Sequence, residues 1–581
     1  MTATAPTSTP ATDPAPPAAW DTTVDLVVVG AGVAGLTAAL VAAIEGARVL
    51  VVEKATQVGG TSARSSGTVW IPGNDPMVAE GFTDEPEAAM TYLDALVGDR
   101  APRELRQSYV DHGPEMLRYV EAHAGVRFRP YPGQPDYRQE LPGARTGWRA
   151  VEPLPFDGRE LGEHFAEVGS PLRELMLFGG WGGMMVTRGE VARLLKLGTS
   201  WDALKLGASL VARFVRDRLR HHRGTRLVLG NALVARLYRN TLQRGVDVWL
   251  DAPASRLVRE DGRVYGIVVR HEGREVAVRS RHGVVLAGGG FPASAELREQ
   301  YLPAPTAQYT AAAPGSTGDT IRLAQDVGAT LGPRGEDNAL WFPSSIATRP
   351  DGSTMVYPHI VLDRGKPGVI AVNAAGRRFV NEAVSYHEFT RGMYRSHRDT
   401  PTIPAWLVCD RAFIWRYGLG AIRPRTPRLA AYERSGYLKS GRSLAGLAAR
   451  IGVDAAGLEA TVRRHNAFAA TGVDEDFHRG ENAYDRASGD ATHGPNPCLG
   501  PIIGPTYYAM AVVPTPLGTS LGLLTDGHGQ VLDEEHEPIP GLFACGNDMH
   551  SPFGGEYPGA GSQLGMGMTF GYLAARRALG R

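Results

Sequence analysis

The first regular pattern of hydrophobic and polar positions in the chain lies near its start. Leu26 to Val29 is an apolar run of strand length, and it stops at a glycine-rich turn, residues 30 to 35 with the sequence GAGVAG. An alanine-rich stretch of helical character follows, and a second apolar run, Arg48 to Val52, is closed by Glu53. A strand, a helix and a second strand in this order predict a parallel βαβ unit.

The glycine spacing of this unit is typical of dinucleotide binding. Gly30 permits the tight turn out of the strand, Gly32 lets the backbone approach a pyrophosphate, and Gly35 allows close packing of helix on sheet. A phosphate can then lie on the helix N-terminus, beside Val33 and Ala34. At the end of the second strand, Glu53 is placed to accept hydrogen bonds from a ribose, with Lys54 next to it. The pattern alone does not distinguish NAD from FAD.

Three further glycine-rich stretches have the composition of loops around a ligand. Residues 58 to 70 form a run of small and hydroxyl residues, an apolar run ends in glycines at residues 283 to 291, and another ends at residues 541 to 548 before a final small-residue helix from 562 to 579. Such loops offer backbone N–H groups and hydroxyls as hydrogen-bond donors. The candidate cofactor contacts in them are Gly60, Thr61, Ser62, Ser66, Gly67, Gly288, Gly289, Gly546, Asn547 and Asp548, and Gly561 in the glycine-rich stretch 554 to 561 is another.

Residues 171 to 225 have a different character, with a helical run from Trp201 to Arg223. Leu204, Ala208, Val211 and Val215 share one face of it, and five arginines crowd its C-terminal half. A basic amphipathic helix can lie on an anionic membrane surface. Arginines also compensate the dipole at a helix C-terminus, and the apolar face could instead pack against the rest of the protein. The sequence leaves both alternatives open.

Composition and charge narrow the class of protein. At 581 residues the chain needs roughly two or three domains. Its net charge of zero argues against nucleic acid as a partner. The three cysteines are widely spaced, which suggests neither a disulfide framework nor a metal site and favours a reducing compartment. Residues 1 to 21 are rich in Pro, Ala and Thr and are expected to be a disordered leader, and the chain contains no apolar run of membrane-spanning length.

Four glycine-rich stretches at the two ends of the chain, with a different composition between them, resemble the flavoprotein family of fumarate reductases and succinate dehydrogenases. This resemblance implies an α/β fold, in which a Rossmann-like FAD-binding domain is built from residues 22–336 and 517–581. Residues 337–516 would form an inserted α+β catalytic domain that caps the flavin. Because residues 59 to 70 contain no histidine, the FAD is expected to be noncovalent.

Within that family, three stretches most resemble the 3-ketosteroid delta-1-dehydrogenases. They are residues 148–157 (WRAVEPLPFD), 378–386 (RFVNEAVSY) and 555–561 (GEYPGAG). The resemblance implies removal of hydrogens from C1 and C2 of a 3-oxosteroid, with an external electron acceptor such as a quinone. It assigns Tyr386 as the base, Tyr137 as its helper, and Tyr557 with the backbone N–H of Gly561 as the clamp on the C3 carbonyl.

These residue types suit the chemistry. A C2 proton beside a ketone can be removed only if charge on the C3 oxygen is stabilised, and a hydroxyl with a backbone N–H is a typical donor pair for such an oxygen. The reference pKa of tyrosine is about 10, so a tyrosine base must be made more acidic or must share its charge with a neighbouring phenol. Tyr137 is the candidate neighbour of Tyr386.

Other functions remain open on the same scaffold. Arg377, Arg378, His387 and Arg391 in the middle domain would suit reduction of a dicarboxylate or another enoate. A 4,5-desaturating steroid enzyme is a related alternative, and a flavin electron carrier or redox sensor is a non-enzymatic one. The predicted location is cytoplasmic, with the inner face of the cell membrane as the place of contact if residues 171–225 bind lipid.

Overall fold

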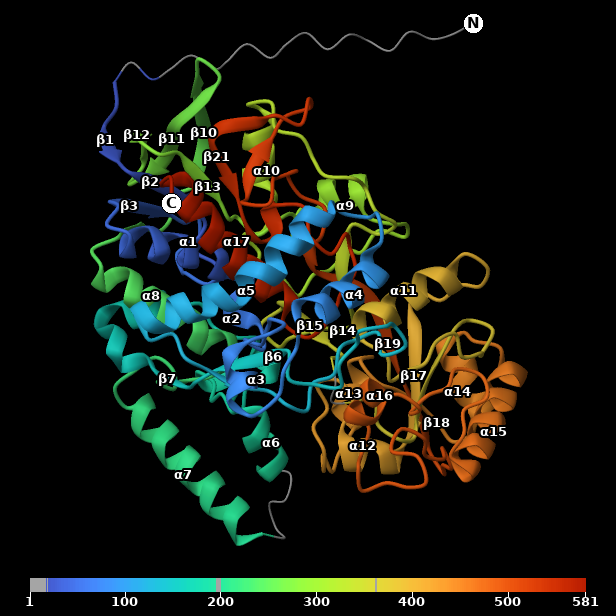
Figure 1. Ribbon diagram of the computed structural model, residues 1–581. Helices are drawn as coiled ribbons and strands as arrows, with labels where there is room; N and C mark the ends of the chain where they lie inside the picture. Colours follow the sequence, from blue (N-terminus) through green and yellow to red (C-terminus); the bar gives the residue numbers. More distant parts are fainter. Residues whose placement is uncertain (1–16, 18, 195–199, 361–362) are drawn as a thin grey trace, which may run out of the picture.

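The computed structural model describes residues 17, 19–194, 200–360 and 363–581 (Figure 1). Most of the predicted leader, residues 1–21, therefore lies outside the described residues. The two ends of the described chain lie side by side, because the blue N-terminal strands and the red C-terminal segments share one layered unit in Figure 1. The orange and yellow middle of the chain forms a second unit beside it.

The first unit is built on a six-stranded sheet with the order β20-β21-β13-β2-β3-β9. Pairing is parallel from β21 to β9, and β20 is antiparallel at the edge. The strands are β2 (Leu26–Val29), β3 (Val49–Val52), β9 (Asp247–Trp249), β13 (Val284–Leu286), β20 (Gln530–Leu532) and β21 (Pro538–Ala544). Because β3 and β13 lie on opposite sides of β2, the chain reverses direction across the sheet at the carboxyl end of β2, where open α/β sheets bind ligands.

Two helices from opposite ends of the chain pack together on this sheet. They are α1 (Val33–Ile44) and α17 (Ser562–Ala578). A Cβ on Gly571 would lie 2.6 Å from the carbonyl oxygen of Ala34, so the helices approach more closely than a larger residue would allow. The predicted α/β class, with a Rossmann-like domain drawn from both ends of the chain, is confirmed. Helix α8 (Leu229–Gln243) packs on the other side of α1.

The second unit has its own mixed sheet, with the order β15-β14-β19-β17-β16 and β18 paired to β19. Its strands are β14 (Ala339–Thr348), β15 (Thr354–Pro358), β16 (Val369–Val372), β17 (Ala405–Asp410), β18 (Lys439–Gly441) and β19 (Tyr507–Thr519). The helices α11 (Tyr386–His397), α14 (Leu444–Ile451) and α15 (Ala455–Thr471) cover it. All residues of β16 are buried, since α11 packs on the face with Val369 and Ala371, and α14 and α15 pack on the face with Ile370 and Val372.

Smaller elements complete the first unit. A four-stranded sheet has the order β1-β12-β11-β10, with β1 (Thr22–Val24), β10 (Ala254–Glu260), β11 (Arg263–His271) and β12 (Arg274–Ser280). Near the chain start lie α2 (Gly60–Arg64), α4 (Pro86–Val97), α5 (Arg103–Ala124) and the strands β4 (Val69–Trp70), β5 (Phe128–Pro130) and β6 (Ala150–Pro153). These elements bring the second glycine-rich loop and the 148–157 motif to the same side of the molecule.

A helical hairpin, α6 (Arg188–Leu194) and α7 (Trp201–Arg218), extends from the first unit (Figure 1). Helix α7 ends at Arg218, five residues before the predicted end at Arg223. The predicted apolar face is not packed on the protein: Leu204, Val211 and Val215 are 49%, 38% and 41% exposed. Inward-facing positions are filled by Leu210 and Phe214 instead. None of the described helices is both long and apolar enough to cross a membrane.

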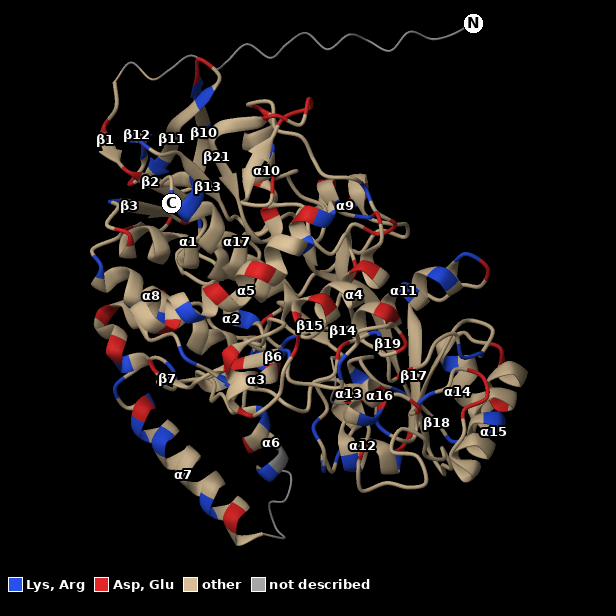
Figure 2. Cartoon of the chain, viewed as in Figure 1, with Lys and Arg blue, Asp and Glu red and all other residues tan. Residues whose placement is uncertain are grey.

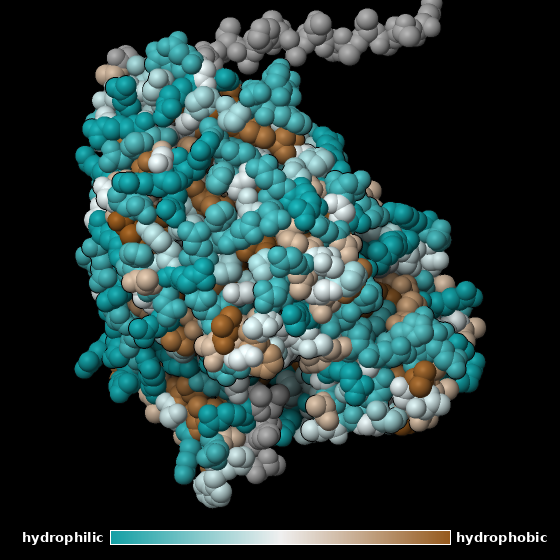
Figure 3. Space-filling model, in the orientation of Figure 1, coloured by the Kyte–Doolittle hydropathy of each residue, from teal (hydrophilic) through white to brown (hydrophobic). Residues whose placement is uncertain are grey.

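The surface of this hairpin combines apolar and basic side chains. Figure 2 shows mainly basic residues along α7, with acidic ones near its two ends, and Figure 3 shows apolar residues among hydrophilic ones over the same lower part of the molecule. Trp201 is 78% exposed and Trp181, just before α6, is 53% exposed. Large apolar side chains at this level of exposure are typical of a surface that contacts something else.

Candidate functional site

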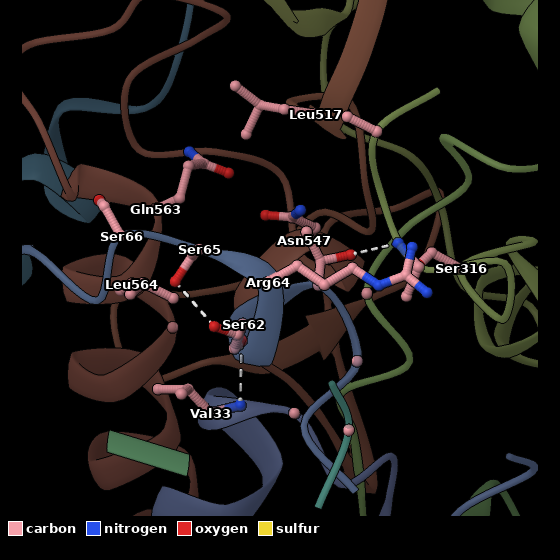
Figure 4. A pocket seen from close by; sticks show the side chains of 18 of the residues that line it. Val33, Ser62, Arg64, Ser65, Ser66, Ser316, Leu517, Asn547, Gln563 and Leu564 are labelled. Atoms are coloured by element: carbon pink, nitrogen blue, oxygen red, sulfur yellow. Dashed lines mark hydrogen bonds between the residues drawn. The ribbon is translucent and has the colours of Figure 1, made fainter. Parts of the chain in front are cut away.

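One cavity of about 820 Å³ lies where the two units meet, and both units line it. On the side of the first unit it is bounded by the glycine-rich turn after β2, the 60–68 loop, Gly288 and Gly289, and the start of α17. The side of the second unit contributes Phe342, Ile360, Tyr386 and Tyr484. Figure 4 shows Arg64, Asn547 and Gln563 projecting from different segments around this space.

The turn after β2 is shaped by its glycines. Gly30 has φ 107°, in the left-handed region, and a Cβ there would lie 2.3 Å from the carbonyl oxygen of Ala287. A Cβ on Gly35 would lie 1.9 Å from the carbonyl oxygen of Gly30. The start of α1 therefore lies against the strand exit with its N-terminus toward the cavity, where it can bind an anionic group. Ser62 Oγ accepts from the backbone N–H of Val33 at 3.3 Å (Figure 4).

Glu53 lines the cavity and also supports the turn. Its carboxylate accepts hydrogen bonds from the backbone N–H of Ala31 at 2.8 Å and of Ala55 at 2.9 Å. Burial raises the pKa of this carboxyl, and the two N–H groups oppose that rise. The neighbouring Lys54 also lines the cavity and forms an ion pair with Asp319. A carboxylate in this position can still offer its remaining lone pairs to a ribose.

Most predicted cofactor residues line this one cavity. Those that do are Gly30, Gly32, Val33, Ala34, Glu53, Lys54, Gly60, Thr61, Ser62, Ser66, Gly288, Gly289, Gly546, Asn547 and Gly561. Gly35, Gly67 and Asp548 are not among the described lining residues. Gly35 serves packing, as expected. A Cβ on Gly67 would lie 2.3 Å from the backbone carbon of Leu229, so Gly67 serves packing too.

Asp548, predicted as a cofactor contact, is not among the described residues that line the cavity. Asp548 is fully buried, and its carboxylate accepts from the backbone N–H of Gly288 at 2.5 Å and of Gly290 at 2.8 Å. These bonds fix the glycine cluster that follows β13, so Asp548 shapes the cavity wall from behind. Its neighbour Asn547 lies in the cavity. Both residues lie in the short 3-10 helix Gly546–Asp548 after β21, and the sequence did not show which one faces inward.

Several cavity residues were missed from the sequence, among them Arg64 and Gln563. Arg64 donates to the carbonyl oxygen of Ala312 at 3.2 Å, and burial lowers the pKa of its guanidinium. Gln563, in the first turn of α17, has both amide atoms buried without a hydrogen-bond partner among the described residues. A buried amide facing a cavity is costly unless a ligand satisfies it. The cavity therefore fits a ligand with an anionic part and a hydrogen-bonding edge, which a flavin dinucleotide has.

Three predicted tyrosines meet at the second-unit end of the cavity. The hydroxyl of Tyr137 lies 2.9 Å from that of Tyr386, and the ring centroids of Tyr386 and Tyr557 are 5.5 Å apart. Each of the three is 6% or 7% exposed. A fourth, Tyr484, was missed: its ring lies 5.0 Å from that of Tyr137 and it also lines the cavity. Gly561 lies at the N-terminus of α17, beside this cluster.

Local hydrogen bonds fix the segments that carry the tyrosines. Tyr386 is the first residue of α11, and the side chain of Ser385 caps that helix by accepting from the N–H of Glu388. The backbone N–H of Tyr137 donates to the carbonyl oxygen of Pro558 at 3.0 Å, which ties its loop to that of Tyr557. Hence the three rings are fixed relative to one another by main-chain contacts as well as by packing.

The 148–157 motif supports the loop of Tyr137. Arg149 is fully buried and donates to Asp136 at 2.7 Å and to Asp84 at 2.7 Å and 2.8 Å. Asp136 also accepts from the indole N–H of Trp70 at 2.8 Å. A buried cation with two carboxylates and a full set of hydrogen bonds fixes the backbone that carries Tyr137.

Burial dominates the acidity of the cluster. It raises the pKa of Tyr386 and Tyr137 well above the usual value for tyrosine, and that of Tyr557 to about 12. A neutral Tyr557 is a good hydrogen-bond donor. For Tyr386 the same burial opposes ionisation, so a base at this position needs charge stabilisation from its surroundings.

The residues that would suit a dicarboxylate are occupied. Arg391 donates to Asp337 at 2.7 Å and to Glu556 at 2.8 Å, and Arg378 pairs with Glu382 and Asp474. His387 is 1% exposed, and burial holds its pKa well below the usual value, so its imidazole is neutral. Arg377, Arg378, His387 and Arg391 are not among the described residues that line the cavity.

Comparison with known proteins identifies the class to which this site belongs. A family model described as an FAD binding domain matches residues 25–564, so the chain belongs to this family of FAD-binding flavoproteins. Its cofactor is FAD. Gln563, Arg64, Glu53 and the N-terminus of α1 are the groups that fit it.

Individual relatives cover nearly the whole chain. A 3-oxosteroid 1-dehydrogenase of Mycobacterium tuberculosis (strain ATCC 25618 / H37Rv) is 40% identical over 95% of this chain and 97% of its own length. A 4-oxocyclohexanecarboxylate 2-dehydrogenase of Sinomonas cyclohexanicum is 38% identical over 96% of this chain and 93% of its own. The crystal structure of 3-ketosteroid delta1-dehydrogenase from Sterolibacterium denitrificans, in complex with 1,4-androstadiene-3,17-dione, superimposes with a TM-score of 0.89 at 39% identity and covers 96% and 100% of the two chains.

Proposed function

We propose that this protein is an oxidoreductase that introduces the 1,2 double bond into 3-oxosteroids, with FAD as the acceptor of hydride, in steroid degradation. The observation that supports this most directly is the convergence of Tyr386, Tyr137, Tyr557 and Gly561 on one end of the cofactor cavity. They come from segments far apart in the sequence. The relatives named above act, by their names, on 3-oxosteroids and on a cyclic ketone, and both substrates carry an acidic C–H beside a carbonyl.

In this proposal the tyrosines divide the work. Tyr557 and the backbone N–H of Gly561 donate hydrogen bonds to the C3 oxygen and stabilise its negative charge. Tyr386 takes the proton from C2, and Tyr137 stabilises its oxygen through their 2.9 Å contact. Bound FAD supplies an acceptor for the hydride that leaves C1. The protein orients the steroid, keeps water out of the buried cluster and holds the proton on Tyr386.

The division of the chain and the further partners are part of the proposal. We assign residues 22–336 and 517–581 to the FAD-binding domain and 337–516 to a catalytic domain that caps it, which the two separate sheets support. FAD is held noncovalently. With FAD bound, the protein would need an external electron acceptor such as a quinone. The exposed apolar and basic surface of α7 supports contact with the inner face of the cell membrane.

An anaerobic titration tests the function. The purified FAD-bound protein is mixed with a 4-ene-3-oxosteroid, and its flavin absorbance is followed. Stoichiometric bleaching, with a 1,4-diene-3-oxosteroid as product, is expected. Bleaching with a 5α-3-oxosteroid to a 4-ene product would indicate the 4,5-desaturating alternative, oxidation of reduced flavin by fumarate would indicate an enoate reductase, and a flavin unaffected by any of them would indicate a carrier or sensor.

Replacing the base tests its role. Tyr386→Phe removes only the hydroxyl, so FAD should remain bound while the rate of bleaching falls by about 10²- to 10⁴-fold, the usual contribution of a general base. Tyr507→Phe is the matched control, because the hydroxyl of Tyr507 lies outside the cavity and donates to the carbonyl oxygen of Ile503. An unchanged rate in Tyr386→Phe would contradict the assignment.

A further inference from the structure

A buried guanidinium lies behind the tyrosine cluster. Arg364 is 2% exposed, and its side chain donates four hydrogen bonds to main-chain carbonyl oxygens. The acceptors are His359 at 2.8 Å, Ile360 at 3.1 Å, Glu382 at 2.7 Å and Val384 at 2.8 Å. Neither the motifs nor the comparisons assign this residue a role.

These four bonds join two segments that both shape the substrate end of the cavity. The carbonyls of Glu382 and Val384 belong to the turn immediately before Ser385, the cap of α11, and Tyr386, its first residue. The other two belong to the stretch in which Ile360 lines the cavity wall. The planar guanidinium of an arginine has enough N–H donors to bind all four oxygens at once. Arg364 therefore fixes the backbone from which Tyr386 projects.

The charge of Arg364 is not used in an ion pair. Within the part of the chain that the structure describes, no carboxylate oxygen lies within ion-pair distance of its guanidinium. Its sequence neighbour Asp363 is bound instead to the imidazole of His359 at 2.6 Å and to the N–H of Gly420 at 2.9 Å. The carbonyl groups that solvate this buried cation carry no net charge, and the nearby carboxylate of Asp363 partly offsets its positive charge.

The positive charge of Arg364 acts on two tyrosines of the cluster. Burial lowers the pKa of Arg364, as does the nearby charge of Arg479, and attraction to Tyr484, to the carboxylate of Asp363 and to Tyr137 opposes this. Conversely, Arg364 opposes the rise that burial causes in the pKa of Tyr484. Other charged or titratable groups facing the cluster and Arg364 are Tyr557, His387, Arg188, Asp363 and Arg479. Arg188 shares the carboxylate of Glu152 with Arg129, and its charge opposes the rise that burial causes in the pKa of Tyr137.

We propose that Arg364 is the positioning residue of the base: it holds the turn that carries Tyr386 and places a buried positive charge behind Tyr137 and Tyr484. The idea rests on the proposed function. Before the steroid enters and excludes water, Tyr386 loses its own proton to solvent, and its negative charge is shared with Tyr137 through their hydrogen bond. The C2–H bond of the steroid then breaks and a new O–H bond forms on Tyr386, while the hydride from C1 reduces FAD. Arg364 stabilises the negative charge that precedes this step.

Stopped-flow reduction of the FAD-bound protein by a 4-ene-3-oxosteroid, measured as a function of pH, tests this role. Removing the charge in Arg364→Met should move the alkaline rise of the rate upward by about one pH unit, equivalent to a rate about tenfold lower at neutral pH. Arg364→Lys keeps the positive charge but loses the planar guanidinium and most of its hydrogen bonds. The pH midpoint of the alkaline rise should therefore stay the same while the rate of flavin reduction falls. Affinity for the 1,4-diene product, which needs no base, should change little in both.

Arg298→Met is the matched control. Arg298 is 7% exposed and donates only to the carbonyl oxygens of Pro292 at 3.3 Å and Gln308 at 3.2 Å, away from the tyrosines. Its removal should leave the pH midpoint unchanged. If Arg364→Met has the wild-type midpoint, or moves it no more than the control does, the charge role is wrong.

Two further outcomes are decisive. If Arg364→Met does not retain FAD, the lysine variant tests the positioning role alone, and a wild-type rate in that variant would overturn it. If the wild-type flavin is not bleached by any steroid, the proposed function fails instead. The two failures are therefore distinguishable in the same experiment.

Discussion

Single residues in this molecule often serve the backbone and the cavity at once. Glu53 is the clearest case, because its carboxylate accepts from Ala31 in the glycine-rich turn and still lines the cavity. The carboxylate of Asp548 also supports the backbone, since it accepts from the N–H groups of Gly288 and Gly290. An acidic residue that follows a strand can thus bind either the neighbouring loop or the ligand. Its position in the sequence does not show which of the two it binds.

Glu53→Ala should weaken FAD binding by roughly tenfold or more, since it removes two backbone hydrogen bonds to a charged group, each worth about 1.5–3 kcal/mol. The preference among steroids should not change, because the tyrosine cluster lies at the other end of the cavity. Measurement of FAD dissociation by fluorescence checks this. Glu121→Ala, at an exposed site on α5, is the control. Equal FAD affinity in both variants would contradict the role of Glu53.

At the scale of elements, α11 and α7 differ in how much of their apolar surface is buried. Helix α11 is packed on β14 and carries Tyr386 at its first position, and Arg391 ties it to the carbonyl oxygen of Gly555, two residues before Tyr557. Helix α7 packs through Leu210 and Phe214 and leaves Leu204 and Val215 outside. The first helix gains its position from burial, whereas the second presents an unburied apolar face.

Leu204→Glu combined with Val215→Glu should reduce binding to anionic phospholipid vesicles by about tenfold, because both apolar contacts are lost and two like charges are added. Steroid turnover in detergent-free buffer should be retained. Cosedimentation with vesicles measures the effect. Val473→Glu with Ile503→Glu is the control, since these residues are 51% and 69% exposed at other sites. The same loss in both pairs would argue against a role for α7.

For the whole molecule, the site depends on contacts between segments that are far apart in sequence. Tyr137 and Tyr386 are 249 positions apart, yet their hydroxyls are in hydrogen-bond contact. The cluster is closed by Tyr557 from the C-terminal part and Tyr484 from the second unit. Folding therefore buries several phenols together. Because buried phenols resist ionisation, the free energy of unfolding should depend on pH.

Stability should fall steeply above pH 10. The pKa of Tyr557 is about 12, and burial raises those of Tyr386, Tyr137 and Tyr109 well above the usual value for tyrosine. Unfolded tyrosine ionises near pH 10, so the unfolded chain loses protons first. This stabilisation is complete below about pH 10 and is lost as the pH rises toward the folded values, by about 1.4 kcal/mol per unit for each group. Urea unfolding from pH 8 to 12 measures it, and a constant midpoint would contradict the prediction.

The sequence by itself determined the local architecture. The spacing of Gly30, Gly32 and Gly35 between two apolar runs predicted the βαβ unit, because short-range sterics decide where a backbone can turn and approach. Its motifs also led to Tyr386 and Tyr557, which lie in recognisable stretches, whereas Tyr137 was assigned by the family resemblance from a loop without a distinctive pattern.

Tertiary structure alone decided which side chains meet. Nothing in the local sequence of Arg364, Gln563 or Tyr484 indicates a site, because their roles arise only when the two units close around the cavity. The orientation of Asn547 inward and Asp548 outward follows from the glycine cluster after β13, more than 250 residues earlier. Local sterics set the turns and helices, whereas the distances between remote side chains depend on how the complete chain packs.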